Sequence, residues 1–532
     1  MSLPQYSTSP QPQPGRARRW SALVVLMFPV LLVAVDNTVL SFAVPAVSSA
    51  LAPTSTQLLW IIDVYPLVLA GLLVPMGSLG DRIGRRKLLL LGGVGFAVVS
   101  AVAAFMPSAP LLIAARALMA VFGAMLMPAT LSLIRNIFTN AAERRLAIAA
   151  WASAFSGGAA LGPIVGGWLL EHYWWGSIFL LSVPMLLPLL LLGPFLIPES
   201  RDPAPGRVDP ASIALAMGAL APIVYGIKAA TGHGPAWVAT VAIVCGLLCG
   251  FAFVRRQLRS TSPMLDVRLF RNPVFSAALL VNLFSVFALV GFIYFLAQHL
   301  QLIAGLSPME AGFFMVPGLV LTVVFGFVAV PLVQRIGASR VVMAGLAFST
   351  CAYILVVAFG RSGSMPALLA AFCVLGIGVG LAETISNDLT LSAVPSHRAG
   401  AAAAISETAY EVGSVLGTAI LGSILNAAYS RGVSVPEHLQ PAQADRVRET
   451  LAGAVDVAGT LPSSGNAAVL MESAAHAFDS GVTITAAIAA ALMLTALLVA
   501  RRALRQPIVE GPTPPRSPIG SAETAETTAK KR

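Results

Sequence analysis

The chain has 532 residues, of which 57% are hydrophobic and only 11% are charged. Soluble globular proteins carry about 25% charged residues. The composition therefore excludes a soluble protein and indicates an integral membrane protein over almost the whole length. The formal net charge of +10 does not indicate a nucleic-acid partner, because the basic residues flank apolar segments instead of forming one patch.

Fourteen apolar segments are each long enough to cross a bilayer, which takes about 20 helical residues. In chain order they lie at 20–44, 58–80, 88–106, 110–134, 146–170, 176–198, 211–229, 237–254, 273–298, 309–333, 341–360, 366–394, 400–427 and 481–500. The first segment is too long for a cleaved signal peptide and contains Asp36, so we expect it to be a span.

Basic residues concentrate in every second connection between these segments. If the N-terminus is cytoplasmic, most of the 33 Lys and Arg residues lie in the cytoplasm. Arg116 lies within a span, and the residues that fall on the opposite side are Lys228, Arg361, Arg431, Arg446 and Arg448. Because cytoplasmic loops carry an excess of Lys and Arg, we expect both termini to be cytoplasmic. The Arg-rich and Ala-rich composition is typical of a GC-rich bacterium, so we expect a bacterial inner membrane.

An internal repeat relates the two halves of the chain. The segment 81–87 after the second span is echoed by 334–340 after the tenth span. A glycine pair in the fifth span recurs in the thirteenth span: Gly158 and Gly162, then Gly413 and Gly417. Two similar halves around a central cavity are typical of secondary transporters. We therefore predict an all-α integral membrane protein with a 6+2+6 arrangement of helices.

The predicted division of the chain follows from this repeat. It comprises a disordered cytoplasmic N-terminus at 1–19, an N-terminal six-helix bundle at 20–198, two inserted helices at 211–254, a C-terminal six-helix bundle at 273–500 and a cytoplasmic tail at 501–532. The extracellular loop 428–480 contains apolar-periodic pieces. Either a short helical hairpin or an unstructured loop fits this pattern, and both alternatives stay open.

Ionisable residues at membrane depth are costly and therefore indicate function. Seven such residues occur in the predicted spans: Asp36, Asp63, Arg116, Glu383, Asp388, Glu407 and Glu411. At 1.5 Å per residue, Asp36, Asp63 and Arg116 all lie about 20–24 Å from the cytoplasmic end of their spans. A buried arginine stabilises a nearby carboxylate, so this layer suits proton coupling. A purely structural Arg–Asp pair is the alternative.

Glu407 and Glu411 are spaced i, i+4 and share one face of their span. The repulsion between two close carboxylates would be relieved by a cation that enters the cavity, or one acid could simply pair with a neighbouring helix. Glu383 and Asp388 lie nearer the cytoplasm, where a hydrated structural acid and a gate are equally compatible with the sequence. Tyr410 belongs to a group of aromatic residues that could enclose an organic cation.

The cysteines and histidines have neither metal-ligand spacing nor a disulfide framework. We expect Cys245, Cys249, Cys351 and Cys373 to be small core residues. His172, His299 and His397 lie at span ends and should be solvated loop residues. No metal or cofactor is expected.

Glycines and a proline interrupt the fifth span, at Gly158, Gly162, Pro163, Gly166 and Gly167. A membrane helix tolerates this run because neighbouring helices satisfy the backbone groups that the proline frees. Glycines at near-helical spacing also remove side chains from one face, so another helix can approach closely.

Five motifs now stand in a fixed order over about residues 20–505. They are Asp36-x-Thr38-Val39 with Ala43-x-Pro45, Gly77-x-Leu79-x-Asp81-Arg82-x-Gly84-Arg85-Arg86-Lys87, Arg116 with Gly123, Gly158 to Gly167, and Glu407-Thr408-Ala409-Tyr410-Glu411. Together they resemble the fourteen-span drug:proton antiporter family of the major facilitator superfamily, particularly its quaternary-ammonium and multidrug pumps. Met119 and Ala120 depart from the Gln-Gly that is usual in the fourth-span motif.

The resemblance implies a role for each motif. Asp36, Arg116 and Asp63 would serve proton coupling, and Asp63 would also share substrate binding with the acids and tyrosine of the thirteenth span: Glu407, Tyr410 and Glu411. The gating motif would latch the cytoplasmic gate and comprises Gly77, Asp81, Arg82, Gly84 and Arg85. The glycines and proline of the fifth span would form the antiporter motif.

The expected function is proton-driven export of lipophilic cations across the membrane by a protein that acts as a monomer. One alternative is a dedicated exporter of one endogenous metabolite or self-made antibiotic. An alternative of another class is a non-transporting membrane sensor or enzyme. The sequence contains no Walker loop, nucleophile elbow or metal-binding cluster, so ATP-driven transport and catalysis lack support.

Overall fold

The computed structural model describes residues 15–201, 209–231, 235–260, 263–359, 364–394, 399–436, 439–461 and 464–504. Residues 1–14 and the tail after Leu504, both expected to be disordered, lie outside the described residues. Helix α1 already begins at Arg16, so the basic residues at 16–19 are helical and extend the first span.

Within the described ranges, fourteen helices are long and apolar enough to cross a membrane, as the sequence predicts. The N-terminal bundle contains α1 (Arg16–Leu51), α2 (Ser55–Ile83), α3 (Arg85–Ala103), α4 (Ala109–Ile137), α5 (Ala141–His172), and the consecutive α6 (Ser177–Leu180) and α7 (Ser182–Leu196). The inserted pair is α8 (Pro210–Thr231) and α9 (Ala236–Arg259), followed by the short helix η1 (Val267–Arg271). The C-terminal bundle contains α10 (Pro273–Gln298) with η2 (His299–Ile303), α11 (Pro308–Ile336), α12 (Ala338–Phe359), α13 (Met365–Ser392), α14 (Ala399–Leu416) with η5 (Gly417–Gly422) and α15 (Ser423–Gly432), and α18 (Ser464–Ala503).

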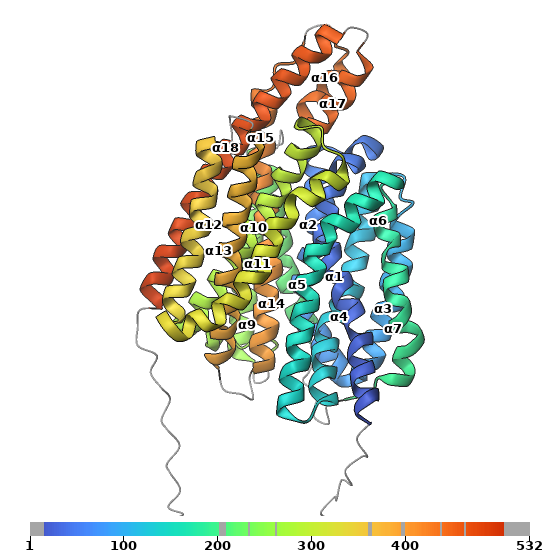
Figure 1. Cartoon of the computed structure of the whole chain (residues 1–532), viewed down its shortest axis with the longest axis vertical. Coiled ribbons are helices and arrows are strands. Elements are labelled where there is room, and N and C mark those ends of the chain that lie inside the picture. The colour runs from blue at the N-terminus through green and yellow to red at the C-terminus, as the bar shows by residue number, and fades with distance from the viewer. Residues whose placement is uncertain are drawn as a thin grey trace, which may run out of the picture.

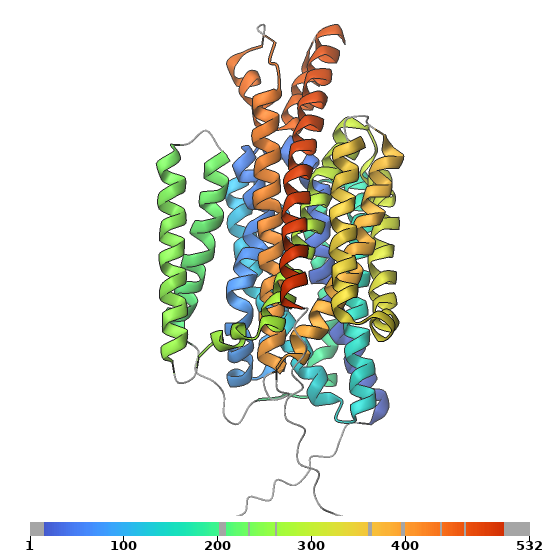
Figure 2. The same cartoon turned by 90° about the vertical axis from the view of Figure 1, so that its left-hand side faces the viewer.

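The two bundles stand side by side, and the two helices α16 (Pro441–Glu449) and α17 (Leu451–Thr460) project beyond them at one end (Figure 1). We call this the hairpin end, and we call the opposite end, where α1 begins and α18 finishes, the terminal end. The inserted helices α8 and α9 stand to one side of the molecule (Figure 2). They pack on each other, and α8 also contacts α2.

The internal repeat is visible in the backbone and in the helix packing. Gly84 and Gly337, at the equivalent junctions α2–α3 and α11–α12, both have positive φ, at 111° and 86°, which glycine adopts without strain. Glycines of α5 face α1: a Cβ at position 158 would lie 2.8 Å from the Cβ of Ala34. Glycines of η5 face α10 in the same way, with a Cβ at position 417 lying 2.7 Å from the carbonyl oxygen of Phe287.

The segment 428–480 is largely helical. It holds the end of α15, the hairpin of α16 and α17, and the first turns of α18, so the helical alternative for this segment is correct. Thr450 caps α17, where its hydroxyl accepts a hydrogen bond from the Gly453 amide at 3.0 Å. The Tyr429 hydroxyl donates to the Val447 carbonyl at 3.0 Å and ties the hairpin to α15. These contacts explain why the polar segment folds against the bundle.

The hairpin of α16 and α17 and the start of α11 contact the N-terminal bundle at the hairpin end. Ser49 of α1 donates to the Asp456 carboxylate of α17 at 3.0 Å, and the Ser55 amide donates to Glu449 at 2.8 Å. Near the same end, a Cβ on Gly312 of α11 would lie 2.6 Å from the Pro163 carbonyl of α5. These contacts hold the two halves of the chain together at the hairpin end.

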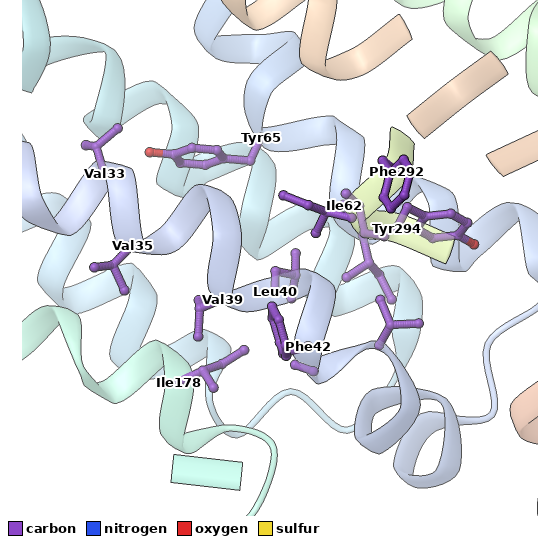
Figure 3. Close-up of a cluster of buried hydrophobic side chains, with 14 of the residues drawn as sticks. Val33, Val35, Val39, Leu40, Phe42, Ile62, Tyr65, Ile178, Phe292 and Tyr294 are labelled. Carbon is purple, nitrogen blue, oxygen red and sulfur yellow. The ribbon is translucent and has the colours of Figure 1, made fainter. Parts of the chain in front are cut away.

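A buried apolar cluster joins the bundles in the interior. Side chains of α1 and α2, such as Phe42 and Ile62, lie together with Phe292 and Tyr294 of α10 (Figure 3). The cluster positions α1 and α2, which carry two of the candidate charges, against the C-terminal bundle.

The cysteines are not core residues, so that prediction is wrong. Cys245 and Cys351 are exposed, and Cys249 and Cys373 are partly exposed. In a membrane protein the surface that faces lipid is as apolar as the core. An apolar stretch of sequence therefore does not show whether a residue faces lipid or the protein core.

Candidate functional site

Asp36 of α1 and Arg116 of α4 form an ion pair inside the N-terminal bundle. Arg116 Nη1 lies 2.8 Å from Asp36 Oδ2, and the two side chains are 2% and 9% exposed. Arg116 Nε donates to the Ile61 carbonyl at 3.3 Å, and the guanidinium lies 4.6 Å from the centroid of the Tyr65 ring. These two residues therefore lie together, as the equal depth predicted for them indicates. Tyr65 and its apolar neighbours appear in Figure 3.

Asp63 does not join this pair, although the sequence places it at the same depth. Its carboxylate instead lies 2.8 Å from Nζ of Lys228 on α8, and both side chains are fully buried. The sequence counts Lys228 among the basic residues on the extracellular side, and in the structure its side chain is buried. Because α8 packs against α2, the long lysine stem reaches inward to the acid.

Glu407 and Glu411 lie on one face of α14, as their spacing predicts. Glu411 is 2% exposed, and its Oε2 has no hydrogen-bond partner among the described residues. Glu407 is half-buried. Within those residues neither acid forms an ion pair. Glu411 is close enough to Asp36, and Glu407 to Glu383, for their charges to interact.

An aromatic row crosses from the N-terminal bundle to α14. Trp151 and Phe155 of α5 stack with centroids 6.4 Å apart. Phe155 and Tyr410 form an edge-to-face pair with ring centroids 5.8 Å apart. Tyr410 lies three residues after Glu407, on the same side of the helix. The site therefore combines carboxylates with aromatic faces, the two groups that attract organic cations.

A sequence comparison identifies the family to which the chain belongs. The family model described as Major Facilitator Superfamily matches residues 26–418. The chain belongs to the Major Facilitator Superfamily. Its members are transporters, so the alternative of a membrane enzyme or sensor does not apply.

Similar members of the superfamily are resistance proteins of bacteria. The chain is 53% identical to the multidrug efflux pump LfrA of Mycolicibacterium smegmatis over 92% of this chain and 97% of that protein. It is 37% identical to the methyl viologen resistance protein SmvA of Salmonella typhimurium, over 90% and 96% respectively. It is 31% identical to the tetracenomycin C resistance and export protein of Streptomyces glaucescens over 91% of each chain.

Solved structures of the superfamily share the fold. A bacterial homologue of the lysosomal transporter Spinster, in an inward-facing and occupied conformation, superposes with a TM-score of 0.62. The alignment covers 92% of this chain and 98% of that chain at 17% identity, which establishes the fold alone.

The residues of the predicted gating motif are held within the N-terminal bundle. Asp81 Oδ1 lies 2.7 Å from Nη2 of Arg85. Arg85 also donates to the Ser200 hydroxyl at 3.1 Å, and Glu199 accepts from the Arg86 amide at 3.0 Å. Arg82 is exposed. Arg85 and Arg86 are thus fixed to the segment that follows α7, and Gly84 provides the positive-φ link between α2 and α3.

The antiporter motif of α5 serves two interfaces. Gly158, Gly162 and Gly166 face α1, where a Cβ on any of them would meet Ala34, Thr38 or Val39. On Gly167, a Cβ would lie 2.7 Å from Met309 Cα of α11, in the other bundle. The glycine spacing therefore allows the close helix approach that the sequence predicts.

His299 is a buried residue that the sequence assigns wrongly to a solvated loop. Its Nδ1 lies 3.2 Å from Asp479 of α18, because α10 continues through η2 beyond the predicted end of the span. His172 is exposed, and His397 lies outside the described residues.

Proposed function

We propose that this protein exports lipophilic organic cations in exchange for protons. The observation that carries the proposal is the buried carboxylate of Glu411, whose Oε2 has no hydrogen-bond partner among the described residues. An isolated charge in an interior of low dielectric constant is strongly disfavoured, so this group takes up a proton or a cation. The relatives LfrA and SmvA, named for multidrug efflux and methyl viologen resistance, support export of cationic drugs.

The aromatic row beside the acids gives the selectivity for lipophilic cations. Such a cation carries its charge on a large apolar body, which Phe155 and Tyr410 can contact through their ring faces. Glu407 and Glu411 supply the negative charge. Because methyl viologen carries two positive charges, two carboxylates one helical turn apart suit it particularly well.

Exchange follows because a proton and a cation compete for the same carboxylates. A cation that binds Glu411 displaces the proton from this carboxylate. After the cation leaves, Glu411 takes up a proton again. The Asp36–Arg116 pair lies within electrostatic range of Glu411, so a change of charge at one site alters the other. We assign proton coupling to this group of three residues.

The direction of transport follows from the orientation of the protein in the membrane. We infer that the terminal end is cytoplasmic, because the basic residues gather there, and that the membrane is the bacterial inner membrane. Because the two halves of the chain are held together at the hairpin end, cargo would enter from the cytoplasmic side. Both bundles belong to one chain, so we expect a monomer to suffice.

Everted membrane vesicles that contain the protein test this function. An imposed proton gradient should drive ethidium accumulation, and collapse of the gradient by a protonophore should abolish it. Glu411→Gln should remove the accumulation, whereas Glu472→Gln, a change at an exposed glutamate of α18, should leave it intact. Gradient-independent transport would refute proton coupling, and transport by Glu411→Gln at the wild-type rate would refute the role of this acid.

The relative that exports tetracenomycin C favours a second candidate function, the dedicated export of one metabolite. A dedicated exporter would move one compound far better than all others. The two functions are separated by measuring ethidium accumulation in the presence of a panel of unrelated cations. Inhibition by several of these cations supports the multidrug function, whereas inhibition by none supports dedicated export.

A further inference from the structure

Lys228 is the one buried lysine among the described residues, and it comes from the inserted helix pair. Nζ lies 2.8 Å from Asp63 Oδ2 and 4.0 Å from the centroid of the Trp60 ring. Asp63 and Trp60 are spaced i, i+3 on α2, so they present one carboxylate and one aromatic face to the same point. This combination is a typical binding site for an ammonium group.

A small pocket with mostly polar lining residues lies beside this lysine, and Lys228 forms part of its lining. Ser55 of α2, Ser423 and Asn426 of α15, and Glu449 of α16 also line it. Lys228 thus lies between this pocket and Asp63, which is not part of the lining.

We propose that Lys228 is a specificity-determining residue that occupies a cation site at Asp63 and Trp60 as a tethered competitor of cationic cargo. Cationic cargo must displace the lysine to reach Asp63. When the cargo leaves towards the hairpin end, the lysine returns and prevents the cargo from binding again. This inference rests on the proposed export of cations, and it changes the expected role of Asp63, which is not a vacant acid.

The alternative is that the Asp63–Lys228 pair only holds α8 on α2. Breaking a buried ion pair by removing one partner destabilises a protein strongly, so loss of stability in a single variant does not separate the two roles. The decisive property is whether a free cation takes the place of the lysine.

Chemical labelling of the wild-type protein tests displacement without any substitution. The other lysines of the chain are Lys87, Lys530 and Lys531, and Lys87 is exposed. Purified full-length protein is treated briefly with acetic anhydride, with and without saturating ethidium, and acetylation is quantified by mass spectrometry. Ethidium should raise acetylation of Lys228 by about tenfold, because an amine released from a charged hydrogen bond reacts faster, and should leave Lys87 unchanged. Unaltered labelling of Lys228 at saturating ethidium overturns the proposal.

Exogenous ammonium ions test the site directly. Lys228→Ala opens space next to Asp63, so propylammonium chloride should raise the Tm of this variant by several degrees relative to sodium chloride at equal concentration. The response should be absent in wild type and in Asp63→Asn/Lys228→Ala. Arg256→Ala is the matched control, because Arg256 forms an exposed ion pair with Asp209 at 2.8 Å on the same inserted helices. An equal response in Asp63→Asn/Lys228→Ala, or none in a folded Lys228→Ala, overturns the proposal.

The two tests remain decisive if one variant does not fold or if the proposed function fails. If Lys228→Ala does not fold, the labelling of wild type decides alone. If wild type does not bind ethidium, as measured by its fluorescence, the proposed export of cations is wrong. The propylammonium response still reports whether Asp63 forms a cation site.

Discussion

At the residue scale, the burial of charges explains both what the sequence predicts and what it misses. Asp36 and Arg116 could be paired because each is the isolated charge of a long apolar segment, and helix rise gives their depth. Lys228 escaped prediction because it lies near the end of its segment, where a lysine usually turns to water. The sequence does hold a signal, since an isolated Asp63 on a neighbouring span needs a partner.

The Asp36–Arg116 pair gives the first prediction. Asp36→Asn should reduce gradient-driven efflux by at least about tenfold and lower the Tm, because removal of one partner of a buried pair costs about 3–5 kcal/mol. Asp36→Asn/Arg116→Met removes both charges and should recover most of the Tm without recovering efflux. Efflux and thermal unfolding of both variants are the measurements. If stability and efflux return together in the double variant, the pair is only structural.

The acids of α14 give the second prediction. Glu407→Gln should lower resistance to dicationic methyl viologen more than resistance to monocationic ethidium, because a second positive charge benefits from a second carboxylate. Glu411→Gln should remove resistance to both compounds, because this acid also takes part in proton coupling. The measurement is the minimal inhibitory concentration of each compound in a pump-deficient host, with Glu472→Gln as the exposed control. If Glu407→Gln protects as well as wild type against both compounds, recognition of the second charge rests on other residues.

At the element scale, glycine spacing could predict close helix packing, but the partner helix emerges only from the structure. The α5 glycines face α1 over most of the motif and α11 at Gly167. The repeat predicts the matching contact of α14 and η5 with α10. The hairpin could not be settled from periodicity alone. Its stability depends on Tyr429, Thr450 and the contacts with α1 and α2, which lie far apart in the sequence.

Two adjacent glycines of α5 give the third prediction. A Cβ on Gly158 would lie 2.8 Å from Ala34 Cβ and 2.9 Å from the Leu31 carbonyl, whereas a Cβ on Gly157 would meet nothing within 4 Å. Gly158→Val should therefore destabilise the protein by about 1–3 kcal/mol and reduce efflux. Gly157→Val should retain the wild-type Tm and efflux. Similar thermal unfolding of the two variants would show that α1 and α5 do not pack closely.

At the scale of the whole molecule, the charge asymmetry predicts an orientation, and this gives the fourth prediction. An epitope tag inserted at residue 437, between α15 and α16, should be reached by antibody on spheroplasts. A tag at residue 261, after α9, should be reached only after the inner membrane is permeabilised. Protection of the first tag in intact spheroplasts would reverse the proposed topology, and with it the direction of transport.

The last prediction concerns the contacts at the hairpin end. Ser49 of α1 belongs to the N-terminal bundle and Asp456 of α17 to the hairpin of the C-terminal half, and their side-chain oxygens lie 3.0 Å apart. A transporter that alternates between two faces must separate such contacts in every cycle. Ser49→Cys/Asp456→Cys, in a background with serine at the four native cysteine positions, should form a disulfide upon oxidation.

This cross-link should stop efflux, and reduction with dithiothreitol should restore it, while ethidium binding from the terminal end should survive oxidation because that end stays accessible. Each single cysteine variant is the control and should be insensitive to oxidation. Efflux that continues in a fully cross-linked protein would mean that the hairpin end does not open between these two residues. Release would then follow another path, such as the polar pocket beside Lys228.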